Sequence, residues 1–149
     1  MPKISQKCEY GIRTLLELSQ RFGEGPISVT EIADRQAVPR RFLELIVREL
    51  RTAGLVKSFR GAKGGYTLVG DPAKVTMGQI IRLLDGPLSP MDCLECGGER
   101  YCPLQGRCIY ACVWQQAEKA LNQVYDGITF QDLVEGKCRD ARFGAEARA

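Results

Sequence analysis

The sequence predicts a mainly α-helical fold with one small β-hairpin. Apolar residues recur at helical spacing through most of the chain, while two short β-type runs, 55–59 and 66–69, flank the Gly-rich turn RGAKGG. With 149 residues, 44% hydrophobic and 26% charged, the chain is long enough to bury a core. The hydrophobic runs all fall short of the ~20 residues that a membrane span needs. We therefore expect a globular protein without a membrane segment.

Three helices are expected before the hairpin. The first covers residues 8–22, where apolar side chains share one face. The second begins after Ser28, which forms the pattern of a capping box with Glu31, and ends near residue 36. The third covers residues 39–53 and has Pro39 at its first helical position. Two short helices joined by a tight turn therefore precede the hairpin.

The region after the hairpin is expected to contain a helix, a loop, a long helix and a short helix. Thr76 and Gln79 form a second capping-box pattern at the start of a helix that ends by Gly86. Residues 87–107 have no periodicity and are expected to form a loop. The long helix is expected over residues 108–125. Its apolar stripe consists of Ile109, Val113, Ala117, Leu121 and Val124.

The net charge of +3 is distributed unevenly along the chain. Residues 35–63 contain eight basic side chains but only two acidic ones, Glu44 and Glu49, whereas the segments on either side are slightly acidic. Such a concentration is typical of a surface that binds phosphates. It also occurs on solvated helix faces that bind nothing, so charge alone leaves both interpretations open.

The order of helices and hairpin adds a second argument for DNA binding. Two short helices followed by a Gly-rich ribbon form the winged helix–turn–helix pattern, whose second helix enters the major groove. Arg suits guanine, Glu accepts from cytosine, and a basic wing tip suits phosphates or the minor groove. The predicted DNA-binding residues are Ser28, Thr30, Pro39, Arg40, Arg41, Phe42, Glu44, Arg48, Arg51, Arg60, Lys63 and Gly64.

Five of the seven cysteines fall in the pattern C-x2-C-x5-C-x5-C-x3-C between Cys93 and Cys112. The N-terminus has no signal-peptide pattern, so we expect a cytoplasmic protein, in which clustered thiols bind metal or act in redox chemistry. The wide, Gly-rich spacing suits an iron–sulfur cluster, while a closed zinc site usually has two C-x2-C pairs. An iron–sulfur cluster, a zinc site and a thiol switch all remain open on spacing alone.

Enzymatic functions are disfavoured by composition. The chain has no histidine, which excludes Ser-His-Asp, Cys-His and His-ligated zinc chemistry. We expect no enzyme activity and no small-molecule substrate. An iron–sulfur electron carrier is a remote alternative that leaves the basic stretch unexplained.

Over about residues 1–135 the chain resembles the IscR/NsrR-type iron–sulfur winged-helix transcription regulators of bacteria, the Rrf2 family. The resemblance rests on YGIRTLLEL, on ISVTEIADRQAVPRRFLELIVRELRTAGLVKSFRGAKGGYTL, and on C-x5-C-x5-C. It implies a homodimer, crossed through the long helix, that binds a palindromic operator in double-stranded DNA. A 2Fe-2S or 4Fe-4S cluster would sense redox, nitric oxide or iron status. Glu44 falls on the family's base-reading acid and Arg60 on its wing arginine.

The resemblance also implies the cluster ligands. Cys96, Cys102 and Cys108 match the family's three cluster cysteines. The fourth ligand of some members is a histidine, at a position that holds Ala111 here. In others it is an acidic residue of the first helix, which falls at Glu9.

Other cysteines compete for the fourth position. Cys112 is favoured because it lies one helical turn beyond Cys108, and Glu9 of the partner subunit is its rival. Cys8 and Cys93 are further candidates, and no role is expected for Cys138.

These expectations divide the chain into four parts. Residues 1–86 form the winged helix–turn–helix DNA-binding domain, and 87–107 form the cysteine-rich cluster-binding loop. Residues 108–136 supply the dimerisation helix and a short C-terminal helix, and 137–149 form a flexible tail.

Overall fold

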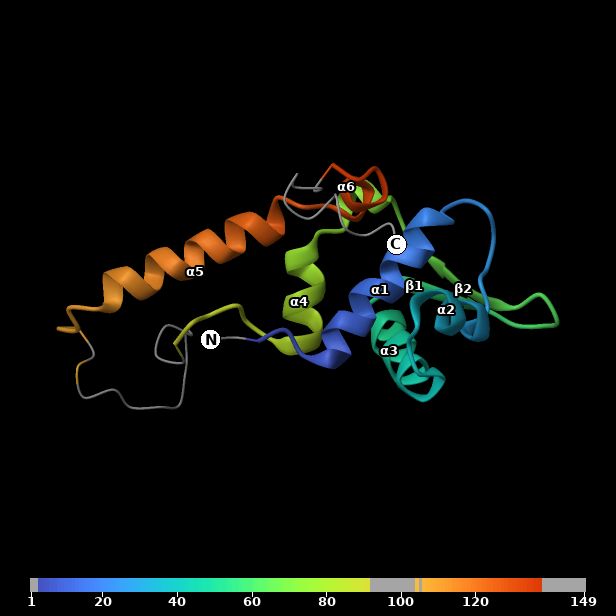
Figure 1. Cartoon of the computed structure of the whole chain (residues 1–149), viewed down its shortest axis with the longest axis horizontal. Helices are drawn as coiled ribbons and strands as arrows, with labels where there is room; N and C mark the ends of the chain where they lie inside the picture. The colour runs from blue at the N-terminus through green and yellow to red at the C-terminus, as the bar shows by residue number, and fades with distance from the viewer. Residues whose placement is uncertain (1–2, 92–103, 105, 138–149) are drawn as a thin grey trace, which may run out of the picture.

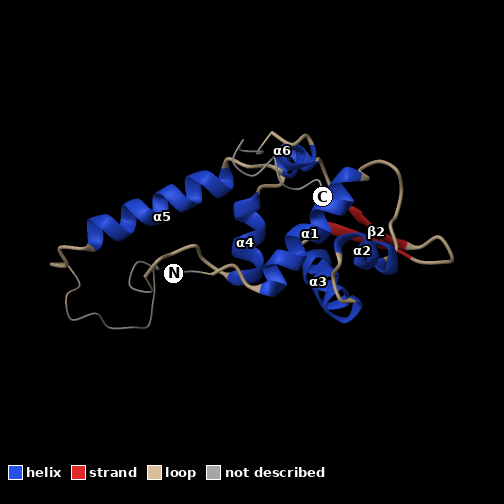
Figure 2. Cartoon of the chain, in the orientation of Figure 1, coloured by secondary structure: helices blue, strands red, loops and turns tan. Residues whose placement is uncertain are grey.

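The helices and the hairpin follow the predicted order in the computed structural model, which describes residues 3–91, 104 and 106–137 (Figures 1 and 2). The first part of the chain forms α1 (Gln6–Gln20), α2 (Val29–Gln36), α3 (Arg40–Thr52), β1 (Val56–Phe59) and β2 (Gly65–Leu68). The second part forms η1 (Pro72–Lys74), α4 (Met77–Asp85), α5 (Ala111–Asp126) and α6 (Phe130–Val134). The mainly helical class with one two-stranded hairpin is confirmed.

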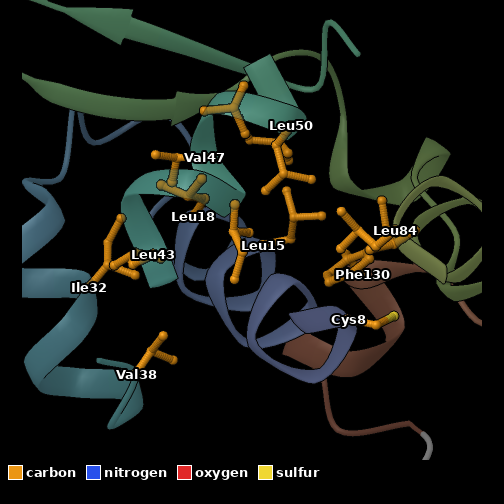
Figure 3. Close-up of a cluster of buried hydrophobic side chains, with 14 of the residues drawn as sticks. Cys8, Leu15, Leu18, Ile32, Val38, Leu43, Val47, Leu50, Leu84 and Phe130 are labelled. Carbon is orange, nitrogen blue, oxygen red and sulfur yellow. The ribbon is translucent and has the colours of Figure 1, made fainter. Parts of the chain in front are cut away.

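Helix α1 lies at the centre of the core, where α2, α3, α4 and α6 pack against it. Its inner face buries Leu15 and Leu18 among apolar side chains of these helices (Figure 3). A Cβ atom at Gly11 would overlap the side chain of Leu84, so the glycine allows α4 to approach α1 closely. The helix begins after Ser5, whose hydroxyl accepts a hydrogen bond from the Cys8 amide.

The start of α2 confirms one half of the predicted capping box. Ser28 Oγ accepts a hydrogen bond from the Glu31 amide at 3.1 Å. The Glu31 carboxylate does not return to the Ser28 amide but pairs with Arg21 at 3.2 Å and with Arg35 at 3.1 Å. The partners of the Glu31 carboxylate are thus two guanidinium groups instead of the Ser28 amide.

A tight turn joins α2 to α3. Ala37 adopts a left-handed backbone conformation with φ = 50°, and the Val38 amide donates to Ala33 O at 3.0 Å. Pro39 is the N-cap of α3 rather than its first helical residue, because its ψ of 127° is extended. Of the two adjacent apolar residues at the start of α3, Leu43 is buried while Phe42 remains about half exposed.

The hairpin lies beside the start of α2. Its strands pair antiparallel from Val56↔Leu68 to Phe59↔Gly65. Tyr66 exchanges two backbone hydrogen bonds with Ile27, of 2.8 and 3.0 Å. A Cβ atom on Gly65 would overlap the Ile27 backbone, so only glycine permits this approach. The wing is thereby fixed against the segment that leads into α2.

Helix α4 begins and ends as predicted. Thr76 and Gln79 form both hydrogen bonds of a capping box, and Gly86 ends the helix with φ = 88°. Beyond it, the described residues 87–91 contain no helix or strand, as expected for the start of the loop.

Helix α5 begins later than predicted, at Ala111 instead of near Cys108. Cys108 O accepts a hydrogen bond from the Ala111 amide at 3.3 Å, which closes a turn before the helix. The expectation that Cys108 and Cys112 share one helix face is therefore wrong. Gly106, just upstream of this turn, has a left-handed backbone conformation with φ = 83°.

The C-terminal elements contact the core in different ways. Helix α5 has no buried residue and extends away from the other helices (Figure 1). Arg82 of α4 donates to Asn122 at 2.8 Å and to Asp126, so α4 packs on the polar side of α5. Helix α6 instead places Phe130 in the core beside α1, although the division by sequence grouped it with the long helix. None of the helices in the described ranges has the length and hydropathy to cross a membrane.

Candidate nucleic-acid interface and cysteine site

The outer face of α3 carries five of the twelve predicted DNA-binding residues. Its inner face buries four apolar residues, which leaves the polar residues of the helix facing water. Arg40 Nε lies 3.2 Å from Glu44 Oε1, one turn further along the helix. The exposed residues on this outer face include Arg40, Arg41, Glu44, Arg48 and Arg51. Together they form a positively charged helix surface with one carboxylate near its start.

A groove separates this helix surface from the wing. It runs between the start of α2, one side of α3 and the hairpin. The sequence predicted most of its polar lining but missed Ser58 and Tyr66, which are paired residues on the two strands of the hairpin. Strand alternation relative to Arg60 was the available signal. The lining includes Ser28, Thr30, Arg40, Arg51, Ser58, Arg60, Gly64 and Tyr66.

The wing tip has the conformation that its glycines allow. Gly61 has φ = 108°, and the Gly64 amide donates to Gly61 O at 2.9 Å to close the turn. Arg60 and Lys63 are exposed at this tip. Lys57 lies 5.3 Å from the ring centre of Phe59, which adds a third cation near the tip. The tip therefore presents several cations on a close-packed backbone.

The turn between α2 and α3 is held to α1 by a buried carboxylate. Glu17 is almost fully buried, and its oxygens accept from Arg35 at 3.2 Å and from Gln36 Nε2 at 2.8 Å. Arg13 of α1 donates to Gln36 O at 3.2 Å. These bonds fix the orientation in which α3 leaves the turn.

Two of the candidate cysteine ligands lie next to the start of α5. Cys108 is half-buried and Cys112 is exposed, and neither forms a disulfide with the other or with Cys8. Cys112 Sγ lies 3.7 Å from Ile109 O. The candidates Cys93, Cys96 and Cys102 lie outside the described residues, as does Cys138, for which no role is expected. Accessible thiols near the cysteine loop have the donor chemistry that an iron–sulfur cluster or zinc requires.

The candidates on α1 lie in contrasting environments. Glu9 is exposed and pairs with Arg13 one turn along the helix. Cys8 is fully buried, and this burial, followed by the charge of Asp85 and a hydrogen bond to it, raises the pKa of its thiol to about 12. The neutral Cys8 thiol suits packing better than metal binding. Within the described part of the chain, no three Cys, Asp or Glu side chains converge on a metal position.

Comparison with known proteins places this geometry in context. A family model described as Rrf2, iron-dependent transcriptional regulator, matches residues 4–136. The HTH-type transcriptional regulator CymR of Bacillus subtilis is 41% identical over 132 residues, which cover 89% of this chain and 89% of CymR.

Solved structures share the same architecture. The structure of CymR, the global cysteine regulator of B. subtilis, matches with a TM-score of 0.74 and 40% identity, covering 91% of this chain and 98% of CymR. The structure of IscR from T. potens matches with a TM-score of 0.73 and 36% identity, covering 91% of this chain and 88% of IscR.

Proposed function

The chain belongs to the Rrf2 family of DNA-binding transcription regulators, and we propose that an iron–sulfur cluster controls its binding to a palindromic operator. The observation that carries the DNA-binding part is the row of exposed arginines on α3 beside the groove of the wing. Phosphate oxygens and guanine edges are the partners that such side chains prefer. Helix α3 would read bases while the wing tip follows the backbone.

The palindromic operator follows from a homodimer built on α5. Val113 and Val124 of the apolar stripe lie on the side of α5 away from Asn122 and Asp126, which hold the helix to α4. Ile109, Val113 and Val124 are all exposed in the single chain. A second copy of α5 would cover this stripe, and two-fold symmetry would place two α3 helices on matching half-sites.

The proposed cluster ligands are Cys96, Cys102 and Cys108, with Cys112 or Glu9 as the fourth. Free thiols at the start of α5 and the similarity to IscR support this set. When bound, the cluster would make the protein sensitive to its environment, because oxygen, nitric oxide or iron shortage would remove the cluster. Cys108 lies three residues before the proposed dimer helix, and Cys112 lies in its first turn. Ligation at these residues would therefore affect how the two copies are arranged.

A cluster-free thiol or zinc switch is the second candidate. It is favoured by the 41% identity to CymR, which is described as the global cysteine regulator of B. subtilis. The same accessible thiols, Cys108 and Cys112, would then be the reactive or zinc-binding groups. The DNA-binding face would be unchanged.

Anaerobic purification separates the two candidates. An absorbance spectrum with counts of iron, sulfide and zinc per chain should show matched iron and sulfide if the cluster is present. One zinc per chain, or no metal after anaerobic reconstitution, would favour the switch. Cys112→Ala and Glu9→Gln variants identify the fourth ligand, because only the true ligand variant should lose the wild-type spectrum.

DNA binding is tested on its own. The full chain is used to select duplexes from random DNA, and the affinity for the selected operator is measured with and without the cluster at several salt concentrations. Affinity should fall steeply with salt because phosphate contacts release counterions. Equal affinity of both forms for every selected duplex would reject control by the cluster.

A further inference from the structure

Leu45 is an apolar side chain on the otherwise polar outer face of α3. It is 56% exposed, although leucine is usually a core residue. It lies one turn after Arg41 and nearly one turn before Arg48, so these three side chains share a face. A shallow hollow on this face is lined by Arg41, Phe42, Glu44, Leu45 and Arg48. Leu45 is therefore surrounded by the groups proposed to contact DNA.

The charges beside Leu45 decide what would cover it. A protein surface that buried Leu45 would also bury Arg41 and Arg48, and two unpaired guanidinium groups carry a large desolvation penalty. DNA offers acceptors to both arginines through phosphates and guanine edges. In the major groove, the apolar feature available to leucine is the C5-methyl group of thymine. Charge complementarity therefore favours DNA as the occupant of this face.

Phe42 is less suited to the same role. Its ring is 49% exposed and packs edge-on against Tyr10 of α1, with ring centres 6.1 Å apart. This contact holds Phe42 toward α1, at the margin of the outer face. Leu45 lies instead on the side of α3 opposite the buried Leu43 and Leu50. It is thus the apolar group directed most nearly away from the core.

We infer that Leu45 contacts a thymine methyl group in the major groove and so specifies a T·A pair in each half-site. This inference rests on the proposed function, in which α3 is the reading helix. The arginines would supply most of the affinity, and Leu45 would select among duplexes that satisfy them. Removing the thymine methyl group that contacts Leu45 should weaken DNA binding roughly fourfold, as expected for one buried methyl group.

The test deletes one methyl group at a time from the DNA. An operator is selected from random duplexes with the full chain, and each dT of one half-site is replaced in turn by dU. Fluorescence anisotropy then gives the affinity of wild type and of Leu45→Ala for each duplex. Wild type should lose roughly fourfold at one dT, whereas Leu45→Ala should bind the dT and dU duplexes equally.

A matched variant controls for general effects. Leu83→Ala removes a leucine that is 40% exposed on α4, outside the DNA-facing surface, and should retain the wild-type difference between dT and dU. Thermal unfolding checks that both variants fold. If no dU replacement weakens wild-type binding, or if Leu45→Ala retains the difference, the inference is wrong.

The same data distinguish this inference from the proposed function. Arg48→Ala should weaken binding to the selected operator whether or not Leu45 contacts thymine. Unchanged binding by Arg48→Ala and Arg41→Ala would reject α3 as the reading helix, and the inference would fail with it. Weaker binding by these variants without any methyl effect would reject the role of Leu45 alone.

Discussion

Replacing Phe130 with alanine should destabilise the whole DNA-binding unit. Phe130 is fully buried and belongs to the same core cluster as Cys8 and Leu84 (Figure 3). Its amide also donates to Val75 O at 2.9 Å, which fixes the start of α6 against the segment before α4. Truncation to alanine therefore leaves a cavity between α1 and α6.

The magnitude follows from complete burial. Truncating a buried phenylalanine costs about 3–5 kcal/mol, because the transfer free energy is lost and a cavity remains. For a chain of this length, each kcal/mol lowers Tm by roughly 2–4 °C. Phe130→Ala should therefore lower Tm by about 10 °C. This would be a large fraction of a typical stability of about 5–15 kcal/mol.

Urea unfolding of the full chain, followed by circular dichroism, measures this loss. Both proteins must be compared at one concentration, because dimerisation stabilises the folded state by mass action. Phe22→Ala is the matched control, since its ring is 50% exposed at the end of α1 and should contribute little. Equal, small losses for both variants would show that α6 does not pack in the core, and would refute the argument.

Three further predictions concern the dimer, the DNA contacts and the buried thiol. Val113→Asp places a charge in the apolar stripe of α5 and should give monomers in analytical ultracentrifugation, whereas Gln115→Asp, on the polar side, should leave dimers intact. Arg51→Ala should reduce the slope of log affinity against log salt by about 1.8 per dimer, one phosphate contact per subunit; an unchanged slope would place Arg51 away from the backbone. Cys8 should resist iodoacetamide at pH 8 while Cys112 reacts, because burial raises the pKa of Cys8 from 9.0 to about 12. The stability that its neutral thiol contributes is complete below pH 9.0 and is lost as the pH rises toward 12. Over this range the unfolding free energy of wild type should therefore decline faster than that of Cys8→Ala. An equal or slower decline would contradict the raised pKa of Cys8.

Local sequence signals predicted the elements well where each signal acts over a few residues. The capping box of Thr76 and Gln79 and the glycine at residue 86 place both ends of α4, since these interactions lie within one or two turns. The start of α5 was misplaced because Cys108 and its neighbours continue the apolar spacing without continuing the helix. Periodicity records which side chains share a face but does not record where backbone hydrogen bonding begins.

Contacts between distant segments could not be predicted in the same way. The half-formed capping box at Glu31 depends on Arg21, which reaches it from the end of α1. Cys8 has the residue type of a ligand, but its burial depends on α4 and α6, which lie far along the chain from α1. Helical spacing distinguishes the buried face of α3 from its outer face, but it does not indicate what an exposed leucine such as Leu45 contacts. Leu45 is exposed because the neighbouring Ile46 occupies the buried face of α3.

The arrangement of α1 links the proposed dimer helix to the reading helix. Arg82 ties α5 to α4 through Asn122 and Asp126, and α4 packs closely on α1 at Gly11. Two reading heads must lie about 34–36 Å apart to occupy half-sites one helical turn apart. Because α1 also holds the α2–α3 turn through Glu17, a rotation of α4 relative to α5 would move α3 with it. In the proposed dimer, a small change where the cysteine loop joins α5 would therefore alter the distance between the two α3 helices, without changing the side chains proposed to read bases.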